Sequence, residues 1–505
     1  MSEKNVIVLF YPSPWQGEQR GRIPYALLYL ERMIRGKGLE VIFINEQTSR
    51  DYLPILESVK DRLLLAGVSA MTGHQILGGI RFSQAVKKLI DVPVVWGGWH
   101  ATLLPEQVLI EPYVDYVICG QGEMPFQKLV EELMASRDPS GVPGVGSKKK
   151  DKILVNPPAS FQDINQFPEV DYRLLDFNPY VFKSAYSNRC IGYFCSHGCP
   201  YNCKFCCVAK IYGRKWYRKK VADVITDLRF FKKQARIDSV TFDDDNFFVN
   251  KAFALELAKE LIDQKLDLLW DTSAHAGLFL KIFKEEDLEL LYRSGCRQVY
   301  IGAESGDQEV LDLIAKEAKV EDNLRFAALL KRHRITPLFS TMVGFPDNPD
   351  KDIRLTLDMI RQAKLTDPSL RARIFFYTPY PGTELYAKAL QHGLKAPERL
   401  ADWATYTLRK FHAPWFKKDY RWALEIFANF YLPLANPDFY KLIPEKQRWA
   451  VFIINKLLYP LVYLRFKFKR FQFPVEAILF LFLLRIFNKL AGTRYALGYE
   501  SYFDA

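Results

Sequence analysis

Six of the eight cysteines lie within 18 consecutive residues of this chain. In the segment CSHGCPYNCKFCC (195–207), three of them follow the spacing C-x3-C-x2-C: Cys199, Cys203 and Cys206. Three thiolates on one short loop can bind three irons of a [4Fe–4S] cluster and leave the fourth iron open to a non-protein ligand. Phe205, directly before the last of these cysteines, would shield one face of the cluster. The spacing therefore predicts an iron–sulfur site with these three cysteines as the metal ligands.

A zinc knuckle is the alternative interpretation of the same cysteines. Structural zinc usually takes four protein ligands in two pairs, and Cys190, Cys195 and Cys207 do not form a clean second pair. These three residues could hold an auxiliary cluster, or they could be small buried side chains. Clustered cysteines in a chain of this length indicate metal or redox chemistry and not a disulfide framework. We favour the iron–sulfur interpretation, with the three additional cysteines buried.

Four loops in the first 125 residues are rich in small and polar residues. Their sequences are YPSPW (11–15), SAMTGHQ (69–75), WGGWHATLLPE (96–106) and CGQGE (119–123). Small residues let a bulky ligand approach the backbone, although each glycine could also serve only to shape its own turn. No G-x-G-x-x-G opens the first helix, which disfavours a dinucleotide.

Residues 1–135 alternate between apolar runs and stretches with helical periodicity. The strand-like runs are 6–11, 41–45, 63–70, 92–96 and 113–119, and the helical stretches are 24–35, 82–89 and 123–134. Repeated βα units predict a doubly wound parallel sheet. Ligands of such sheets bind beyond the carboxyl ends of the strands, where all four loops would lie. We expect a surface loop over 136–160, because Pro, Gly and charged residues are mixed there.

Six further strand candidates alternate with helices in the middle of the chain. The strands are 189–194, 239–243, 268–273, 298–303, 337–343 and 373–378, and the helices are 221–235, 251–266, 284–294, 308–333 and 351–364. This pattern predicts a partial (β/α)6 barrel, open on one side, with its chemistry at the carboxyl ends of the strands. Polar residues stand at those ends, in 243–246, 272–275, 302–306, 340–344 and 377–382. Some of the Asp and Ser residues among them could instead be helix N-caps.

The cysteine spacing, with an aromatic residue before the third cysteine, resembles the signature of radical SAM (S-adenosylmethionine) enzymes. The first domain resembles the cobalamin-binding domain of one large subset, whose G-G-x-H-A-T-x-x-P-E and G-E-G-E patterns are similar to WGGWHATLLPE and CGQGE. The resemblance covers roughly residues 1–400. It implies an α/β protein with a Rossmann-like cobalamin-binding domain (1–150), a linker (151–185), a radical SAM partial barrel (186–400) and a mostly helical C-terminal region (401–505).

The resemblance also implies roles for single residues. Glu304 would contact S-adenosylmethionine, Ser340 and Asp244 would lie near its polar groups, and Tyr377 is a further catalytic candidate. The family's G-G-E-like turn is replaced here by DDDN (243–246), which weakens the assignment of Asp244. Cobalamin would be bound by residues of three loops: Ser69, Thr72, Gly73, His74, Gly97, Gly98, His100, Ala101, Thr102, Gly120, Gly122 and Glu123.

The lower ligand of the cobalt stays open at this stage. The D-x-H-x-x-G motif of other cobalamin proteins is absent. His74 and His100 stand in suitable loops and could ligate the metal. A base-off cofactor with no protein ligand, or with water, is the default expectation.

In enzymes of this kind the reduced cluster cleaves S-adenosylmethionine, and the resulting 5′-deoxyadenosyl radical removes a hydrogen from an unactivated carbon. The resemblance implies a methyltransferase in which methylcobalamin then supplies a methyl group to that carbon. The alternative is an oxidative cyclase or ring-rearranging enzyme similar to the anaerobic tetrapyrrole cyclases. A non-catalytic cobalamin or iron–sulfur sensor is disfavoured by the intact cysteine motif together with Glu304. An external one-electron reductant of the flavodoxin or ferredoxin type is expected as a partner.

The composition excludes a disordered or collagen-like chain, since 49% of the 505 residues are hydrophobic and 25% are charged. The length suggests about three domains. The net charge is +12, and residues 441–490 hold ten Lys and Arg against two Glu, so two thirds of the excess lies in this segment. Its basic residues alternate with Phe, Leu, Ile and Tyr, which disfavours a nucleic acid as partner.

The C-terminal segment 441–490 has two equally weighted interpretations. Basic residues beside apolar and aromatic stretches predict a membrane-surface element, whereas a helical hairpin buried on the barrel would let the same Lys and Arg reach solvent. On the first interpretation the substrate is lipid-like or a hydrophobic macrocycle, and the cytoplasmic protein attaches peripherally to the inner face of the membrane. We find no secretory signal and no apolar run of 18 residues, so no transmembrane helix is expected.

Overall fold

The computed structural model describes residues 4–14, 21–49, 51–149, 152–407, 411–416, 418–442, 445–469, 471 and 474–491. The chain forms two compact units: Met1–Val181, Ser196–Lys220 and Thr378–Phe411 make up the first, and Phe182–Cys195, Val221–Tyr377 and His412–Ala505 make up the second. Neither unit is continuous along the chain. The four consecutive domain ranges expected from the sequence therefore stay a prediction.

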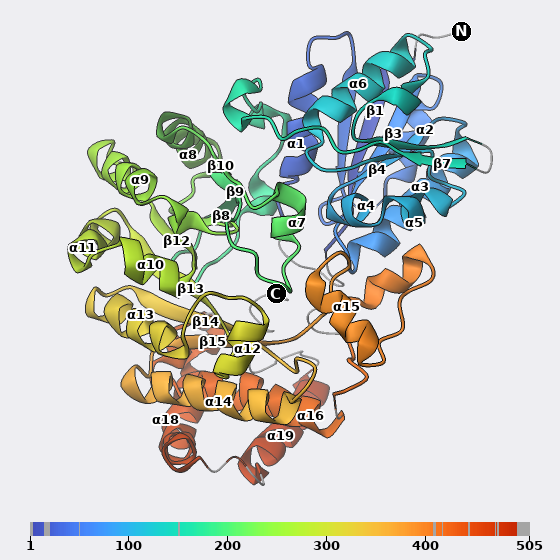
Figure 1. Cartoon of the computed structure of the whole chain (residues 1–505). Helices are drawn as coiled ribbons and strands as arrows, with labels where there is room; N and C mark the ends of the chain where they lie inside the picture. The colour runs from blue at the N-terminus through green and yellow to red at the C-terminus, as the bar shows by residue number, and fades with distance from the viewer. Residues whose placement is uncertain are drawn as a thin grey trace. The chain divides into compact units, whose positions relative to one another are not determined.

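The first unit is built on a seven-stranded sheet with the order β2-β1-β3-β4-β5-β6-β7. Figure 1 labels β1, β3, β4 and β7 of this sheet. Strands β1 to β5 pair in parallel. β1 and β3 are buried along almost their whole length, as expected for strands covered on both faces. This confirms the predicted doubly wound parallel sheet. The elements are β1 (Val6–Tyr11), α1 (Tyr25–Ile34), β2 (Glu40–Asn45), α2 (Leu53–Val59), β3 (Leu63–Ser69), α3 (Gln75–Leu89), β4 (Val94–Gly97), α4 (Trp99–Leu103), α5 (Pro105–Ile110), β5 (Tyr116–Ile118) and α6 (Glu123–Met134).

The surface loop expected over 136–160 is wrong. β6 (Val145–Lys149) and β7 (Lys152–Val155) form an antiparallel hairpin there, and β6 also pairs with β5, so that the hairpin extends the sheet. β7 alternates between exposed and partly buried residues and is the edge strand. Lysines and turn residues are common at such edges, and this explains why the composition resembled that of a loop.

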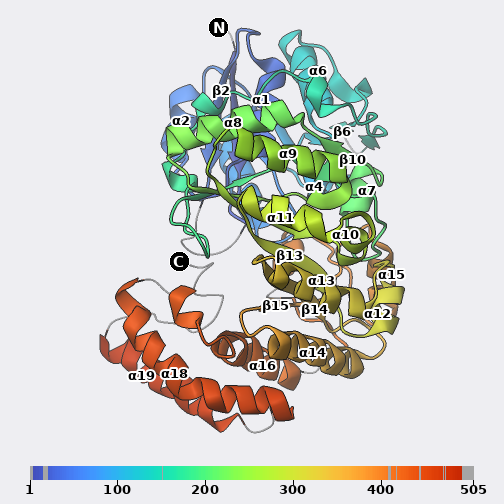
Figure 2. The same ribbon diagram turned by 90° about the vertical axis from the view of Figure 1, so that its left-hand side faces the viewer.

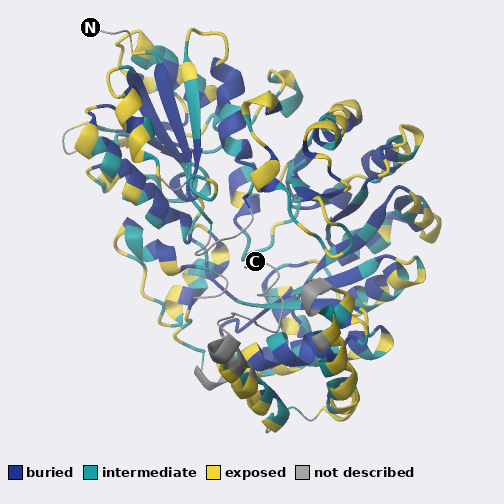
Figure 3. Cartoon of the chain, turned by 180° about the vertical axis from the view of Figure 1, so that it is seen from behind, coloured by how far each residue is buried: buried dark blue, intermediate teal, exposed yellow. Residues whose placement is uncertain are grey.

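The second unit is built on six parallel strands with the order β15-β14-β13-β12-β11-β8. All six predicted barrel strands are confirmed: β8 (Cys190–Tyr193), β11 (Ser239–Phe242), β12 (Leu269–Ala274), β13 (Cys296–Glu304), β14 (Thr336–Val343) and β15 (Arg371–Phe376). The sheet is not closed between β8 and β15, which fits a partial barrel. Most of its strand residues are buried. Figure 3 colours the whole chain by burial, with buried residues in dark blue.

Helices connect these strands in the way that the sequence pattern predicts. They are α8 (Val221–Ala235), α9 (Lys251–Asp263), α10 (Ala276–Ile282), α11 (Glu285–Arg293), α12 (Gln308–Leu313), α13 (Val320–Arg332) and α14 (Pro349–Thr366). The predicted helix 308–333 is divided into α12 and α13, and α10 was not predicted. Each of these helices buries one face, for example Val224 and Leu228 of α8.

The region beyond residue 400 is mostly helical, as predicted. In the first unit, α15 (Glu384–Gln391) precedes the short 3-10 helix η6 (Leu400–Thr405). The second unit ends with α16 (Lys418–Ile426), the π-helical turn η7 (Phe427–Tyr431), α17 (Leu432–Leu434), the 3-10 turn η8 (Phe439–Leu442), α18 (Glu445–Phe468) and α19 (Val475–Ala491). Leu424 of α16 packs with Val343 and Ile353. Within the described ranges, no helix combines the length and apolar character needed to cross a bilayer.

Candidate functional site

The cysteine loop begins directly after β8, and a short hairpin joins its two ends. β9 (Ser196–Gly198) pairs antiparallel with β10 (Trp216–Arg218). Within the loop, the Cys206 backbone N–H donates to the Cys203 carbonyl at 3.0 Å and closes a tight turn. Helix α7 (Val208–Tyr212) then follows at once. The three predicted ligands therefore lie on a loop whose two ends are held together by the pairing of β9 with β10.

Burial separates the three predicted ligands from the other cysteines. Cys199, Cys203 and Cys206 are partly exposed, whereas the remaining five are buried: Cys119, Cys190, Cys195, Cys207 and Cys296. Desolvation raises the pKa of Cys119 to about 11 and that of Cys296 well above its ordinary value. Since the thiolate is the form that binds a metal, such buried thiols are poor ligands.

The three cysteines of the loop can ligate an iron–sulfur cluster. Among the described residues, no three His, Cys, Asp or Glu side chains gather closely enough to ligate one metal ion. In a [4Fe–4S] cluster each thiolate binds a different iron, so the ligands stand farther apart than those of a single zinc ion. The loop is therefore compatible with a [4Fe–4S] cluster.

Asp244 connects the ends of two strands of the second unit. Its Oδ1 accepts a hydrogen bond from the Cys195 backbone N–H at 2.9 Å, and its Oδ2 accepts one from the Cys195 thiol at 2.9 Å. Both residues are buried. This packing explains Cys195 without an auxiliary cluster, and the predicted contact of Asp244 with S-adenosylmethionine stays a prediction.

Glu304 ends β13 in a conformation that is unusual for a residue with a side chain. Its φ is +54°, in a region that costs a non-glycine residue roughly 1–2 kcal/mol. Its carboxylate pairs with the Lys316 ammonium at 2.8 Å, and both side chains are only 10% exposed. A Cβ atom at Gly302 would lie 2.8 Å from Glu304 Oε1 and 2.9 Å from Lys316 Nζ. The glycine therefore leaves the space that the ion pair occupies.

Sequence analysis did not select Lys316, which lies between α12 and α13. His275, at the end of β12, accepts a hydrogen bond from the Leu278 N–H at Nδ1 and so donates from Nε2 to the Lys316 carbonyl at 2.6 Å. Burial lowers the pKa of His275 to about 4, so the ring is neutral at pH 7. No local pattern marks this lysine, because its partners come from two other strand ends.

The side chains of the second sheet alternate between an apolar set and a polar set. In the polar set, the strand register places Gly302, Ser340 and Arg373 in one row across β13, β14 and β15. Ser273 and Tyr300 lie in the neighbouring row. The Arg373 guanidinium is 5.2 Å from the centre of the Tyr300 ring. Ser340, a predicted site residue, thus lies near Tyr300 and Arg373, which the sequence analysis did not select.

A second buried carboxylate connects the loops after β13 and β14. Asp352 of α14 accepts hydrogen bonds from Ser305 Oγ at 2.6 Å and from the Gly344 N–H at 3.0 Å. The Thr356 hydroxyl accepts one from the Gly306 N–H at 2.9 Å. Desolvation raises the pKa of Asp352 to about 6, although the hydrogen bonds that its carboxylate accepts act to lower the pKa. The network fixes the backbone that follows Glu304.

Tyr377 follows β15 and packs between aromatic rings. Its ring stacks on Phe345 with centroids 4.7 Å apart, and the Trp415 ring lies 6.5 Å away. Its hydroxyl has no hydrogen-bond partner within the described part of the chain. Burial raises its pKa, so the hydroxyl stays protonated. A catalytic role for Tyr377 stays a prediction.

The three loops predicted to bind cobalamin lie at one edge of the first sheet, because β3, β4 and β5 are parallel neighbours. Thr72 Oγ1 lies 2.9 Å from His100 Nδ1, and the Gly120 N–H donates to Thr102 Oγ1 at 3.0 Å. Of the fourth loop, YPSPW, Trp15 lies outside the described residues. The structure thus brings together Ser69, Thr72, Gly73, His74, Gly97, Gly98, His100, Ala101, Thr102, Gly120 and Gly122.

At two of these positions a side chain would strain the backbone and crowd a neighbouring carbonyl oxygen. Gly98 has a φ of +90°, and a Cβ atom there would lie 2.7 Å from the Ala70 carbonyl oxygen. Gly73 has a φ of +111°, and its Cβ atom would lie 3.1 Å from the Tyr406 carbonyl oxygen. Bare backbone at the carboxyl edge of a parallel sheet suits a large ligand. These residues therefore fit the predicted cobalamin site.

His100 is enclosed by protein. The residue is fully buried, and burial lowers its pKa to about 3. Its ring lies edge-on to Trp403 with centroids 5.7 Å apart, and the Trp403 indole donates to Gln107 Oε1 at 2.6 Å. Such a ring is not accessible to a cobalt ion, which favours a cofactor without a His100 ligand. His74 is only partly buried, at the N-cap of α3.

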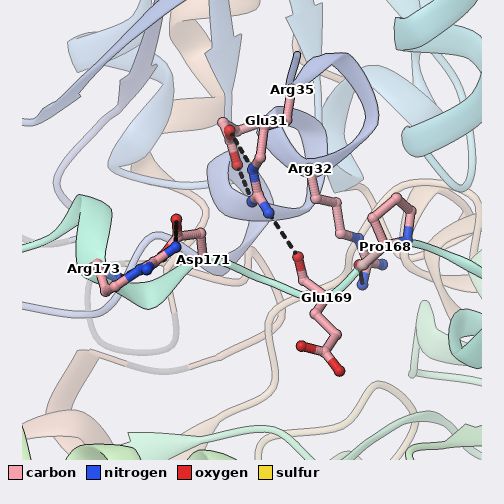
Figure 4. A network of polar contacts seen from close by, with 7 residues as sticks. All are labelled: Glu31, Arg32, Arg35, Pro168, Glu169, Asp171 and Arg173. Carbon is pink, nitrogen blue, oxygen red and sulfur yellow. Dashed lines mark hydrogen bonds and ion pairs between the residues drawn. The ribbon is translucent and has the colours of Figure 1, made fainter.

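Glu123 differs from the other predicted cobalamin residues, because its charge is already paired. Its carboxylate lies 2.9 Å from the Arg32 guanidinium of α1, and the two side chains are 9% and 6% exposed. Arg32 also donates to the Pro168 carbonyl at 3.4 Å, and Arg35 donates to the Glu169 carbonyl at 3.1 Å (Figure 4). These contacts join α1, α6 and the segment after β7. A direct role of Glu123 in cobalamin binding stays a prediction.

Comparison with known proteins agrees with both predicted binding regions. Residues 193–360 match the family model of the radical SAM superfamily, and residues 23–130 match that of the B12 binding domain. An uncharacterized methyltransferase of Pyrococcus horikoshii is 28% identical over 390 residues, which are 76% of this chain and 81% of that protein. The anaerobic magnesium-protoporphyrin IX monomethyl ester cyclase of Rubrivivax gelatinosus is 26% identical over 396 residues, which are 75% of this chain and 69% of that protein.

A solved structure shares the fold over most of the chain. The radical S-adenosylmethionine methyltransferase TsrM from Kitasatospora setae, with cobalamin and a [4Fe–4S] cluster bound, matches with a TM-score of 0.64. The match covers 88% of this chain and 90% of that chain at 18% identity. The cysteine loop, the glycine-rich sheet edge and the two matched domains agree with one another, and the chain therefore combines a domain of the radical SAM superfamily with a B12 binding domain.

Proposed function

We propose that the protein is a methyltransferase that adds a methyl group to an unactivated carbon of a small-molecule substrate. The observation that carries the proposal is the presence, in one chain, of a loop with three partly exposed cysteines and a sheet edge suited to cobalamin. The relative of 28% identity is described as a methyltransferase. The cyclase relative of 26% identity supports oxidative ring closure as the second candidate.

Some residues of this chain would bind the cofactors, and others would orient them. Cys199, Cys203 and Cys206 would ligate the cluster, and the loops after β3, β4 and β5 would bind cobalamin. When bound, the cluster and S-adenosylmethionine supply radical chemistry, and cobalamin supplies a transferable methyl group. Glu304 and Lys316 place a negative and a positive charge 2.8 Å apart. This pair is complementary to the ammonium and carboxylate of the amino-acid end of S-adenosylmethionine, and buried polar pairs of this kind fix orientation.

We also propose a reductant, a membrane surface and a substrate class as partners of the enzyme. The electron would come from an external flavodoxin or ferredoxin. A peripheral attachment to a membrane through residues 441–490 would give access to a lipid-like substrate or a hydrophobic macrocycle. The polar side of the second sheet, with Ser273 and Arg373, would contact the polar groups of that substrate.

The cofactor proposal is tested by anaerobic reconstitution with iron, sulfide and hydroxocobalamin, followed by metal analysis and an optical spectrum. We expect about four irons and one base-off cobalt per chain, together with reductive cleavage of S-adenosylmethionine. Cys203→Ala should lose iron and cleavage, whereas the matched variant Cys296→Ala, at a buried cysteine, should keep both. Iron without cobalt in the wild-type protein would end the methyl-transfer proposal.

Methyl transfer and ring closure differ in their stoichiometry. A methyltransferase of this kind consumes two S-adenosylmethionine molecules per product and yields S-adenosylhomocysteine and 5′-deoxyadenosine in equal amounts. With a trideuterated methyl donor, the product gains the labelled methyl group. A cyclase consumes one molecule and adds no label, and that outcome would favour the second candidate.

A further inference from the structure

The C-terminal hairpin of α18 and α19 exposes a long apolar surface, which we call the hairpin face. Its members recur every three or four residues and so lie along one side of each helix. Each member is between 41% and 72% exposed. On α18 they are Trp449, Ile453, Leu457, Leu461, Leu464 and Phe468, and on α19 they are Val475, Ile478, Leu479, Phe482, Leu483 and Ile486.

The opposite side of the hairpin is firmly packed within the second unit. Val462 and Phe466 of α18 are fully buried, and Phe466 lies 5.6 Å from the Phe427 ring. Arg465 of α18 and Glu476 of α19 form an ion pair that joins the two helices. α18 also contacts α14, and the two helices lie near each other in Figure 2. The hairpin face is therefore the outer side of a docked element and not an unfolded segment.

Basic residues accompany the apolar ones on the same side of α18. Lys456 and Lys467 are exposed and eleven residues apart, which is close to three helical turns. Phe452 and Tyr463 flank them with exposed aromatic rings. Among the described side chains of this hairpin the acidic one is Glu476, whose carboxylate accepts hydrogen bonds from Arg465 and Tyr431. The hairpin face thus combines apolar, aromatic and cationic groups.

We propose that the hairpin face binds the surface of a bilayer that contains anionic phospholipids. Interfacial helices bury an apolar side at the level of the headgroups, and their basic residues interact with anionic lipids. The charges argue against a second copy of the chain as the occupant, since pairing of two such faces would bring Lys456 and Lys467 close to equal charges. The inference deepens the peripheral membrane attachment stated under the proposed function, and it does not depend on the cofactors or on the reaction.

The first experiment measures co-sedimentation of the full-length protein with vesicles. We expect binding to phosphatidylcholine vesicles that contain 30% phosphatidylglycerol, and little binding to pure phosphatidylcholine. Binding should weaken as salt is raised, because exposed charges are screened. Lys456→Gln combined with Lys467→Gln should weaken binding to the anionic vesicles by about 30-fold, from roughly 1 kcal/mol per basic residue.

Two matched double variants distinguish loss of binding through the hairpin face from a general effect of added negative charge. Leu457→Glu with Leu479→Glu should leave the protein in the supernatant. Ile110→Glu with Leu174→Glu adds the same charge at exposed apolar residues of the first unit, which are 68% and 46% exposed, and should bind as the wild type does. Circular dichroism and thermal unfolding verify that each variant is folded.

Three results would overturn the proposal. The first is a wild-type protein that does not sediment with anionic vesicles, or a folded Leu457→Glu/Leu479→Glu variant that sediments as well as the wild type. The second is a wild-type dimer that this variant converts to a monomer, since a second copy would then be the occupant. The third is binding that appears only after residues 492–505 are removed, which would assign the hairpin face to the chain's own end. None of these results bears on cofactor content, so the catalytic proposal is tested separately.

Discussion

An ion pair at the end of β13 constrains Glu304, one of the predicted site residues. Glu304 and Lys316 are 2.8 Å apart and almost buried, so removal of one partner leaves an uncompensated charge that costs about 3–5 kcal/mol. We expect Lys316→Met to lower the free energy of unfolding by this amount, measured by urea denaturation at pH 7. Glu304→Gln combined with Lys316→Met should recover most of the loss.

The control for this comparison of single and double variants is Lys259→Met on α9, at an exposed lysine. It should change the free energy of unfolding by no more than about 0.5 kcal/mol. If the single variants at Glu304 and Lys316 were additive, the two side chains would not be coupled. Their role as a joint site for a charged amino-acid group would then lose its support.

Asp352 gives the folded protein a pH dependence with a defined sign. Its pKa is raised to about 6 in the folded state, against about 3.9 in an unfolded chain. Since the folded state holds the proton more tightly, this contribution to stability is complete below pH 4 and is lost as the pH rises to 6. The full effect is about 3 kcal/mol.

The matched variant for this prediction is Asp352→Asn, which cannot titrate. It loses an acceptor for the Gly344 N–H, a penalty of about 1 kcal/mol that does not vary with pH. Urea denaturation of both proteins from pH 4 to pH 7 should therefore show the wild type losing stability relative to the variant up to pH 6. A difference that is constant across this range would contradict the assignment of the titration to Asp352.

At the scale of elements, the loop after β4 depends on a glycine for two separable reasons. Gly98 has a positive φ, and a Cβ atom there would collide with the Ala70 carbonyl. Gly36 has a similar φ of +78°, with nothing within 4 Å of its Cβ position. Gly36→Ala should therefore cost only the conformational strain, roughly 1–2 kcal/mol, whereas Gly98→Ala should cost several kcal/mol and weaken cobalamin binding. Thermal unfolding and a cobalamin titration by absorbance measure both effects.

The success of sequence-based prediction also follows from the elements. Strands β1 to β5 of the first sheet and all six strands of the second sheet are apolar runs between clear turn residues, and their bounds were predicted to within a few residues. The β6–β7 hairpin was missed because an exposed edge strand has no continuous apolar run. The three cysteine ligands were predicted from their spacing alone, and the structure places them on one loop as partly exposed residues. Lys316 and Asp352 were not recognised, since each acquires its role through contacts between strand ends that are distant in the sequence.

At the scale of the molecule, the sheet edge that is predicted to bind cobalamin is completed by a late part of the chain. The first unit includes residues 378–411, from which Trp403 packs on His100 and Tyr406 approaches Gly73. A protein that ends after the predicted linker lacks these contacts, although it contains every predicted cobalamin residue. Continuity along the chain is therefore a poor guide to what folds independently here.

This predicts how a truncated protein behaves. A fragment of residues 1–185 should unfold at a lower temperature than the full chain, bind hydrophobic dyes and show weaker cobalamin binding. In the full chain, Trp403→Ala should reproduce part of this loss, because removal of a buried Trp costs about 3–5 kcal/mol. Trp422→Ala is the matched control, since Trp422 is 52% exposed. If the fragment bound cobalamin as tightly as the full chain does, the contacts of residues 378–411 would be dispensable for the site, and the cobalamin-binding domain would end before residue 185.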